Sequence, residues 1–148
     1  MEHERNALAL LDSIDRISSR EIVDLFHQLE GISDRYPADA DIRQRYHGSA
    51  DERALLAIGQ YIETVSTLAR RGVLDPSLIV DSVGFLIRLR WSTIEPFVVR
   101  LRRVQQNAYI FENFEWLARY SDWWKDVPRP PNDPNYRPDQ FERGNAKP

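Results

Sequence analysis

The amino-acid sequence predicts an all-α fold, a single small helical bundle of about five helices. Apolar residues recur at helical spacing through most of the chain, and no segment alternates between apolar and polar residues as a half-buried strand does. Residues that cap or end helices separate these apolar segments. At 148 residues, the chain is expected to form one domain that buries a core without a metal or a disulfide.

Two helices are predicted in the N-terminal part of the chain, over residues 7–17 and 22–29; the alternative is one bent rod. Ser18 is expected to cap the second helix in a capping box. Gly31 suits the left-handed position that ends a helix. Residues 33–48 are polar, so we expect a connection there, with room for a short helical turn.

A central antiparallel hairpin is predicted from the next two helices. Ser49 is placed to cap an apolar stripe over residues 54–69, and Gly72 is placed to end it. Asp75 and Pro76 then form an N-cap and a first-turn proline. Because the linker is short, the two helices are expected to pack against each other.

The second helix of this hairpin is predicted to be long and kinked, running from Pro76 to about Val104. Pro96 removes one backbone hydrogen bond, and its ring crowds the carbonyl of Ser92, so we expect a kink at that point. A further helix is expected over residues 109–124, "YIFENFEWLARYSDWW", which is unusually rich in aromatic residues.

Residues 1–125 are thus predicted to form the helical domain, and residues 126–148 a proline-rich disordered tail with little to bury. The net charge of -3 argues against a nucleic-acid-binding surface. No apolar run reaches the roughly 20 residues that cross a bilayer, and the first residues lack a signal-peptide layout. We therefore expect a cytoplasmic protein, and its preference for Arg over Lys hints at a bacterial source.

No metal, cofactor or catalytic residue is predicted. The chain has no cysteine, and His27, three positions after Asp24, is only a weak half of a di-metal helix motif. No phosphate-binding glycine loop, nucleophile elbow or zinc-protease motif occurs.

One buried polar pair is predicted. An ideal projection of the helix from Pro76 places Arg90 on its apolar side, where a guanidinium must be paired. Glu115, at the edge of an apolar stripe on the aromatic helix, is the expected partner. The pair could line a ligand pocket or act only as a structural ion pair, and Arg90 could instead extend its head group to solvent.

A candidate protein-interaction surface is predicted on the aromatic helix. Trp116, Tyr120 and Trp123 share one side of this helix, apart from the stripe that includes Phe114 and Leu117. The N-terminal helices could cover these three rings as core. Otherwise Trp116 and Trp123 stay partly exposed and contact a protein partner or a second copy.

The strings "GFLIRLRW", "EPFV" and "YIFENFEWLA" resemble the C-terminal part of an uncharacterised bacterial helical family, a domain of unknown function. The resemblance covers residues 61–118, and "ENFEWLA" is its most specific part. It implies an all-helical fold and supplies no activity. Many members resemble one another in a membrane helix ahead of the domain, whereas this sequence is expected to start directly with soluble helices, which leaves membrane association an open question.

The function predicted from these features is a non-enzymatic protein-interaction or scaffold module that binds an unknown protein or self-associates. One alternative is a ligand-binding or catalytic helical domain that uses Arg90 and the carboxylates of the aromatic helix. A second alternative, implied by the family resemblance alone, is peripheral attachment to a membrane.

Overall fold

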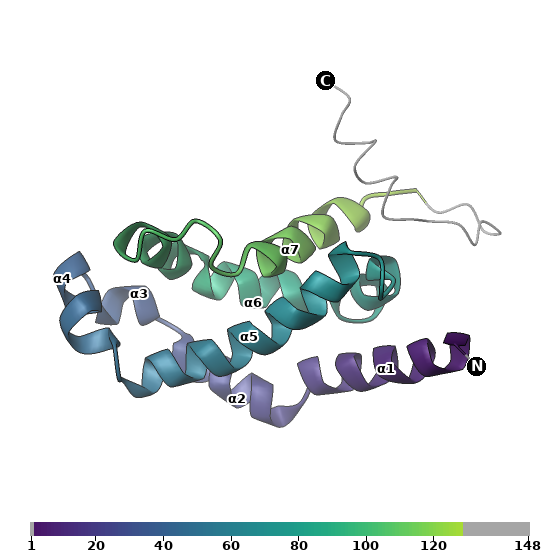
Figure 1. Ribbon diagram of the computed structural model, residues 1–148, viewed down its shortest axis with the longest axis horizontal. Coiled ribbons are helices and arrows are strands. Elements are labelled where there is room, and N and C mark those ends of the chain that lie inside the picture. The colour runs from purple at the N-terminus through teal and green to yellow at the C-terminus, as the bar shows by residue number, and fades with distance from the viewer. Residues whose placement is uncertain (1, 129–148) are drawn as a thin grey trace, which may run out of the picture.

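The computed structural model describes residues 2–128, which are almost entirely helical (Figure 1). Seven α-helices and one π-helical turn make up this part of the chain: α1 (Glu2–Ile17), α2 (Arg20–Leu29), α3 (Ile32–Arg35), α4 (Asp39–Asp41), η1 (Ile42–Tyr46), α5 (Ala50–Arg70), α6 (Pro76–Val104) and α7 (Glu112–Trp124). The predicted all-α class is confirmed. The predicted count of about five helices is not, because the polar segment 33–48 itself contributes short helices.

Most of the helix ends follow from local sequence. Ser49 accepts a hydrogen bond from the backbone of the third residue of α5, and Asp75 caps α6 in front of Pro76. Gly31 and Gly72 take left-handed backbone angles, with φ of 72° and 79°. Glycine is favoured at both positions because it has no Cβ to clash in this conformation.

The junction between α1 and α2 differs from the prediction. Ser19, rather than Ser18, is the N-cap of α2, and its Oγ accepts a hydrogen bond from the backbone N–H of Ile22. Ser18 Oγ instead donates to carbonyls in the last turn of α1. The two helices are therefore separate, with Ile17 as the last residue of the first.

The polar segment 33–48 is ordered by side chains that satisfy its backbone. Arg100 of α6 donates to the carbonyl oxygens of Ser33 and Tyr36, and its side chain is only 18% exposed. A polar segment can thus fold against the core because its carbonyls have buried hydrogen-bond donors.

Asp51, in the first turn of α5, holds the other side of this segment. Its carboxylate pairs with Arg35 at 3.0 Å and accepts a hydrogen bond from the Tyr36 hydroxyl at 2.8 Å. Burial by itself raises the pKa of Asp51, but hydrogen bonds from Arg35, Tyr36 and Gln28 outweigh it and bring that pKa below its ordinary value.

The core is organised around α7 more than around the predicted hairpin. Helix α7 packs extensively on both α5 and α6, whereas α5 and α6 touch each other at few positions. Helices α2 and α7 lie on opposite sides of α5 (Figure 1). The central antiparallel hairpin of α5 and α6 is therefore not confirmed as the main packing unit.

Two contacts from α5 fix the start of α7. The ring of Phe111 sits so close to Gly59 that an added Cβ would lie 2.2 Å from Phe111 Cζ. Phe111 has left-handed backbone angles and provides no side-chain cap, so Glu63 of α5 supplies one. Its carboxylate accepts the backbone N–H groups of Asn113 and Phe114 at 3.0 and 2.8 Å. The negative carboxylate also suits the positive end of the helix dipole.

Helix α6 departs from helical geometry at Val83, with φ of -129° and ψ of 16°, rather than at the predicted position, Pro96. Next to Val83, the Ser121 hydroxyl of α7 donates to the carbonyl of Gly84 at 3.0 Å. A side chain that bonds to a helix carbonyl in this way is one recognised cause of a kink. The break therefore depends on a tertiary contact that the sequence of α6 does not reveal.

The predicted tail, residues 126–148, lies outside the described residues from position 129 onward. Its first three residues follow α7, and Val127 is half-buried against the core.

Candidate functional site

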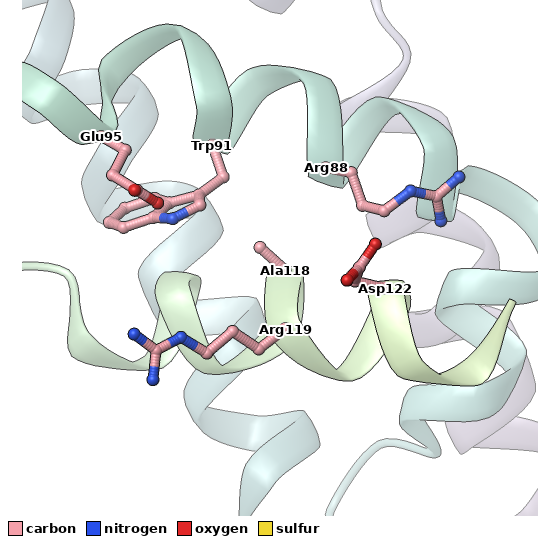
Figure 2. A pocket seen from close by; sticks show the side chains of 6 residues that line it. All are labelled: Arg88, Trp91, Glu95, Ala118, Arg119 and Asp122. Carbon is pink, nitrogen blue, oxygen red and sulfur yellow. The ribbon is translucent and has the colours of Figure 1, made fainter. Parts of the chain in front are cut away.

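A groove of about 260 Å³ lies between α6 and α7. Its lining combines one large aromatic side chain with four charged ones: Arg88, Trp91 and Glu95 from α6, and Ala118, Arg119 and Asp122 from α7. Figure 2 shows Arg88 and Asp122 at one end of the groove and Glu95 and Arg119 at the other, beside the Trp91 indole.

Trp91 is the most constrained residue of this groove. Its side chain is 5% exposed, its ring centroid is 5.1 Å from that of Phe114, and the Arg102 guanidinium lies 5.8 Å from its ring. Its Nε1 atom is buried and has no hydrogen-bond partner within residues 2–128. Buried polar groups nearly always have a partner, so this donor is an exception that needs an explanation.

The rim of the groove carries charges of both signs in facing positions. The helices run antiparallel, and the opposed residues, taken along the groove, are Arg102 with Glu115, Glu95 with Arg119, and Arg88 with Asp122. Arg102 and Glu115 form an ion pair of 2.7 Å, with side chains 18% and 17% exposed. Among the described residues, Glu95 with Arg119 and Arg88 with Asp122 do not form ion pairs across the groove.

Three of the rim charges contact residues in or next to α7. Arg119 reaches back to Glu115 at 2.7 Å and is otherwise 74% exposed. Arg88 Nη1 donates to the Ser121 hydroxyl at 2.8 Å. Asp122, which is 71% exposed, pairs with Lys125 at 3.5 Å. The rim can therefore present both a guanidinium and a carboxylate to a bound molecule.

Arg90 and Glu115 are not brought together, which corrects the predicted pair. Glu115 pairs with Arg102 and Arg119, on the side of α6 that faces α7. Arg90 lies on a different side, where its guanidinium is 5.0 Å from the centroid of the Phe26 ring in α2. The projection placed Arg90 correctly toward an apolar surface, but the sequence does not reveal that α2 covers that surface.

The three predicted interaction residues lie in different environments. Tyr120 is fully buried, whereas Trp116 and Trp123 are partly buried and pack against the core. The Tyr120 ring centroid is 5.4 Å from that of Trp116 and 5.7 Å from that of Trp123. Their role as a protein-interaction surface stays a prediction.

The groove residues were not identified from the sequence, although a signal for them exists. Arg88, Glu95 and Arg102 recur every seven residues with alternating sign, and α7 carries the complementary order. Trp91 lies between two of these charges in the sequence.

Two further findings concern the described residues alone. Within residues 2–128, no three His, Cys, Asp or Glu side chains are grouped so that they could hold a metal ion. None of the helices described has the length and apolar character needed to cross a membrane.

The chain matches a family described as a domain of unknown function (DUF4760) over residues 1–123. Because this match spans most of the 148 residues, the chain belongs to that family. No curated protein and no solved structure matches it. The predicted membership in a family of unknown function is confirmed, over a longer stretch than residues 61–118. The "ENFEWLA" signature and a bacterial origin stay predictions.

Proposed function

We propose that this member of a domain family of unknown function is a non-enzymatic protein-interaction module whose α6–α7 groove receives a short segment of a partner protein. One observation carries the proposal, the buried indole N–H of Trp91 that has no acceptor within the described structure. A buried donor without an acceptor costs about 1–3 kcal/mol. A small shift of the indole toward the groove would bring this N–H to a backbone carbonyl of a bound segment and remove that cost.

The charges on the rim indicate the chemistry of the segment. Arg119 and Asp122 offer a guanidinium and a carboxylate within one turn of α7, and both are mostly exposed. A segment with one acidic and one basic side chain would complement both. The volume of about 260 Å³ is below the roughly 300–1,000 Å³ typical of small-molecule pockets. It therefore suits one or two side chains of a longer chain better than an enclosed ligand.

The proposal includes the absence of catalysis, a cytoplasmic location and a bacterial source, which are supported by composition and motifs alone. The proposal includes no catalytic site built on Arg90 and Glu115, because Arg90 contacts Phe26 and Glu115 pairs with Arg102.

The test starts from random dodecapeptides displayed on phage and selected against the full chain. Selected peptides are then measured by fluorescence anisotropy against the wild type and against Trp91→Phe, which keeps an aromatic ring beside Phe114 but removes the N–H. We expect affinity to fall roughly fivefold to tenfold, the equivalent of about 1–1.4 kcal/mol for one hydrogen bond.

A second variant guards against a packing effect at Trp91. Arg119→Gln removes an exposed rim charge and should also weaken the selected peptides, while Arg43→Gln, a change of another exposed arginine on η1, should not. The proposal fails if no peptide is enriched, or if the enriched peptides bind both groove variants as tightly as they bind the wild type.

A further inference from the structure

The outward face of α6 carries a stripe of exposed residues without a single charge. We call it the outer stripe, and its members are Ser82, Phe85, Leu89, Ser92, Pro96 and Val99. Phe85 is 67% exposed, Leu89 42% and Val99 49%. Because 29% of the chain is charged, a solvent-facing helix surface with no charge over so many positions indicates a surface that contacts another molecule.

The two serines of the outer stripe do not make it polar. Ser82 Oγ donates to the carbonyl of Leu78 at 3.2 Å, and Ser92 Oγ donates to the carbonyl of Leu89 at 2.7 Å. Hydroxyls that bond back to their own helix need no donation to water. Their small size also lets another helix approach closely.

The spacing of the outer stripe fits a partner helix. Its members follow one another at alternating intervals of three and four residues, the repeat that forms the seam between two packed helices. Beyond the break at Val83, the stripe runs from Phe85 to Val99 and is roughly 21 Å long, at about 1.5 Å per residue. A helix of similar length is needed to cover it, and α6 of a second copy has that length.

We propose that two copies of this chain associate through their outer stripes, with the two α6 helices antiparallel about a two-fold axis between Leu89 and Ser92. Around this axis Leu89 of one copy packs on Ser92 of the other, and Phe85 packs on Pro96. The same patch serves both copies, as a two-fold interface requires.

The charges beside the stripe favour this arrangement. Arg88 and Glu95 follow one edge of the outer stripe, and in an antiparallel pair this edge meets itself. Arg88 of each copy then lies opposite Glu95 of the other, so two opposite-charge pairs flank the axis. In a parallel pair this edge would meet the edge that carries Leu86, Thr93 and Arg100, so Arg88 would face Thr93 and have no partner. Glu95 would face Arg100, whose guanidinium already donates to the carbonyls of Ser33 and Tyr36.

The inference goes beyond the proposed peptide groove and also has a consequence for it. Arg88 and Glu95 border the groove as well as the outer stripe. A second copy on α6 therefore competes with a peptide for these two side chains. Self-association is measured without peptide, so its failure is distinct from a failure of peptide binding.

Sedimentation velocity of the full chain from about 5 to 300 μM tests the dimer, because an interface made by one helix pair is small and weak. We expect a monomer–dimer equilibrium that Phe85→Glu weakens at least tenfold. Leu56→Glu, which changes an equally apolar and 55% exposed position on α5, should leave it unchanged. A monomer at every concentration, or a dimer unaffected by Phe85→Glu, overturns the inference.

Charge reversal and a distance measurement test the antiparallel orientation. Glu95→Arg should weaken the dimer, and Arg88→Glu combined with it should restore the dimer. Because the chain has no cysteine, a spin label can be attached at Val99→Cys alone, in the regular part of α6. Antiparallel helices place two such labels roughly 25–30 Å apart, whereas parallel helices place them within roughly 15 Å. The shorter distance, or no rescue by the double variant, overturns the inference.

Discussion

Gly59→Ala should destabilise the protein, even though alanine is the better helix former. The new Cβ would lie 2.2 Å from Cζ and 2.6 Å from Cε1 of the Phe111 ring. The ring cannot withdraw easily, because the backbone of Phe111 precedes α7, whose first turn is held by Glu63. Overpacking or loss of Phe111 burial costs about 2–4 kcal/mol, and alanine returns about 1 kcal/mol of helix preference. The expected net loss is about 1–3 kcal/mol.

Thermal unfolding followed by circular dichroism measures this loss, which corresponds to a melting temperature lower by roughly 3–10 °C for a chain of this size. The decisive comparison repeats the change in a Phe111→Ala background, where no ring opposes the Cβ. There Gly59→Ala should stabilise the protein by up to about 1 kcal/mol, so its effect changes sign. The same effect in both backgrounds would refute the reasoning, because it would show that the contact between Gly59 and Phe111 does not limit the packing.

The remaining predictions concern the polar contacts of the fold. Glu63→Gln should cost about 1–2 kcal/mol in urea unfolding, because α7 loses a charged cap. Glu112→Gln, in the first turn of α7 itself, should cost only about a few tenths of a kcal/mol. Equal costs would contradict the capping role of Glu63. Asp51→Asn should cost about 1–2 kcal/mol at pH 7. The pKa of Asp51 is lower in the folded state than in the unfolded state, so its contribution to stability is complete above the unfolded pKa near 4 and is lost as pH falls through the folded pKa. The difference in unfolding free energy between variant and wild type should therefore shrink below about pH 4. A difference that grows on acidification would contradict a lowered pKa. Arg102→Ala should cost about 2 kcal/mol, because it leaves the half-buried carboxylate of Glu115 short of one cation. Arg90→Ala should cost only about 1 kcal/mol, the value of a cation–π contact. The reverse order would show that Arg90 is the arginine with the larger structural role.

The helices themselves could be predicted because their signals are local. Ser49, Asp75, Gly31 and Gly72 act within one turn of their own position, so the sequence around each is sufficient to place a helix end. The same reasoning placed the α2 cap one residue early, because Glu21 three positions after Ser18 gives the pattern of a capping box, whereas in the fold Ser19 is the cap.

Features that depend on contacts between helices could not be predicted. The kink at Val83 lies beside the hydrogen bond from Ser121 of α7, and the first turn of α7 is capped by Glu63, which lies about fifty positions earlier in the sequence. An ideal projection showed which side of α6 is apolar, but not that α2 covers Arg90 while α7 covers Trp91. The choice of Glu115 as a partner in an ion pair was correct, and its assignment to Arg90 was not.

The candidate site was missed for a related reason. A tryptophan on an amphipathic helix is normally predicted to be a core residue, and Trp91 does pack in the core against Phe114. Its importance for function comes from one atom, Nε1, whose lack of an acceptor can be seen only when every neighbour is placed. The alternating charges on α6 and α7 were visible in the sequence, but they acquire meaning only once the two helices are known to be antiparallel.

The indole N–H signals of the full chain, followed by ¹H–¹⁵N nuclear magnetic resonance, test the central claim most directly. The chain has four tryptophans, and the Trp91 signal can be identified by its absence in Trp91→Phe. When a selected peptide is titrated, the Trp91 signal should move downfield to saturation, because its N–H gains an acceptor. Binding that leaves the Trp91 signal in place and instead shifts those of Trp116 and Trp123 would show that peptides bind at these two indoles and not in the groove.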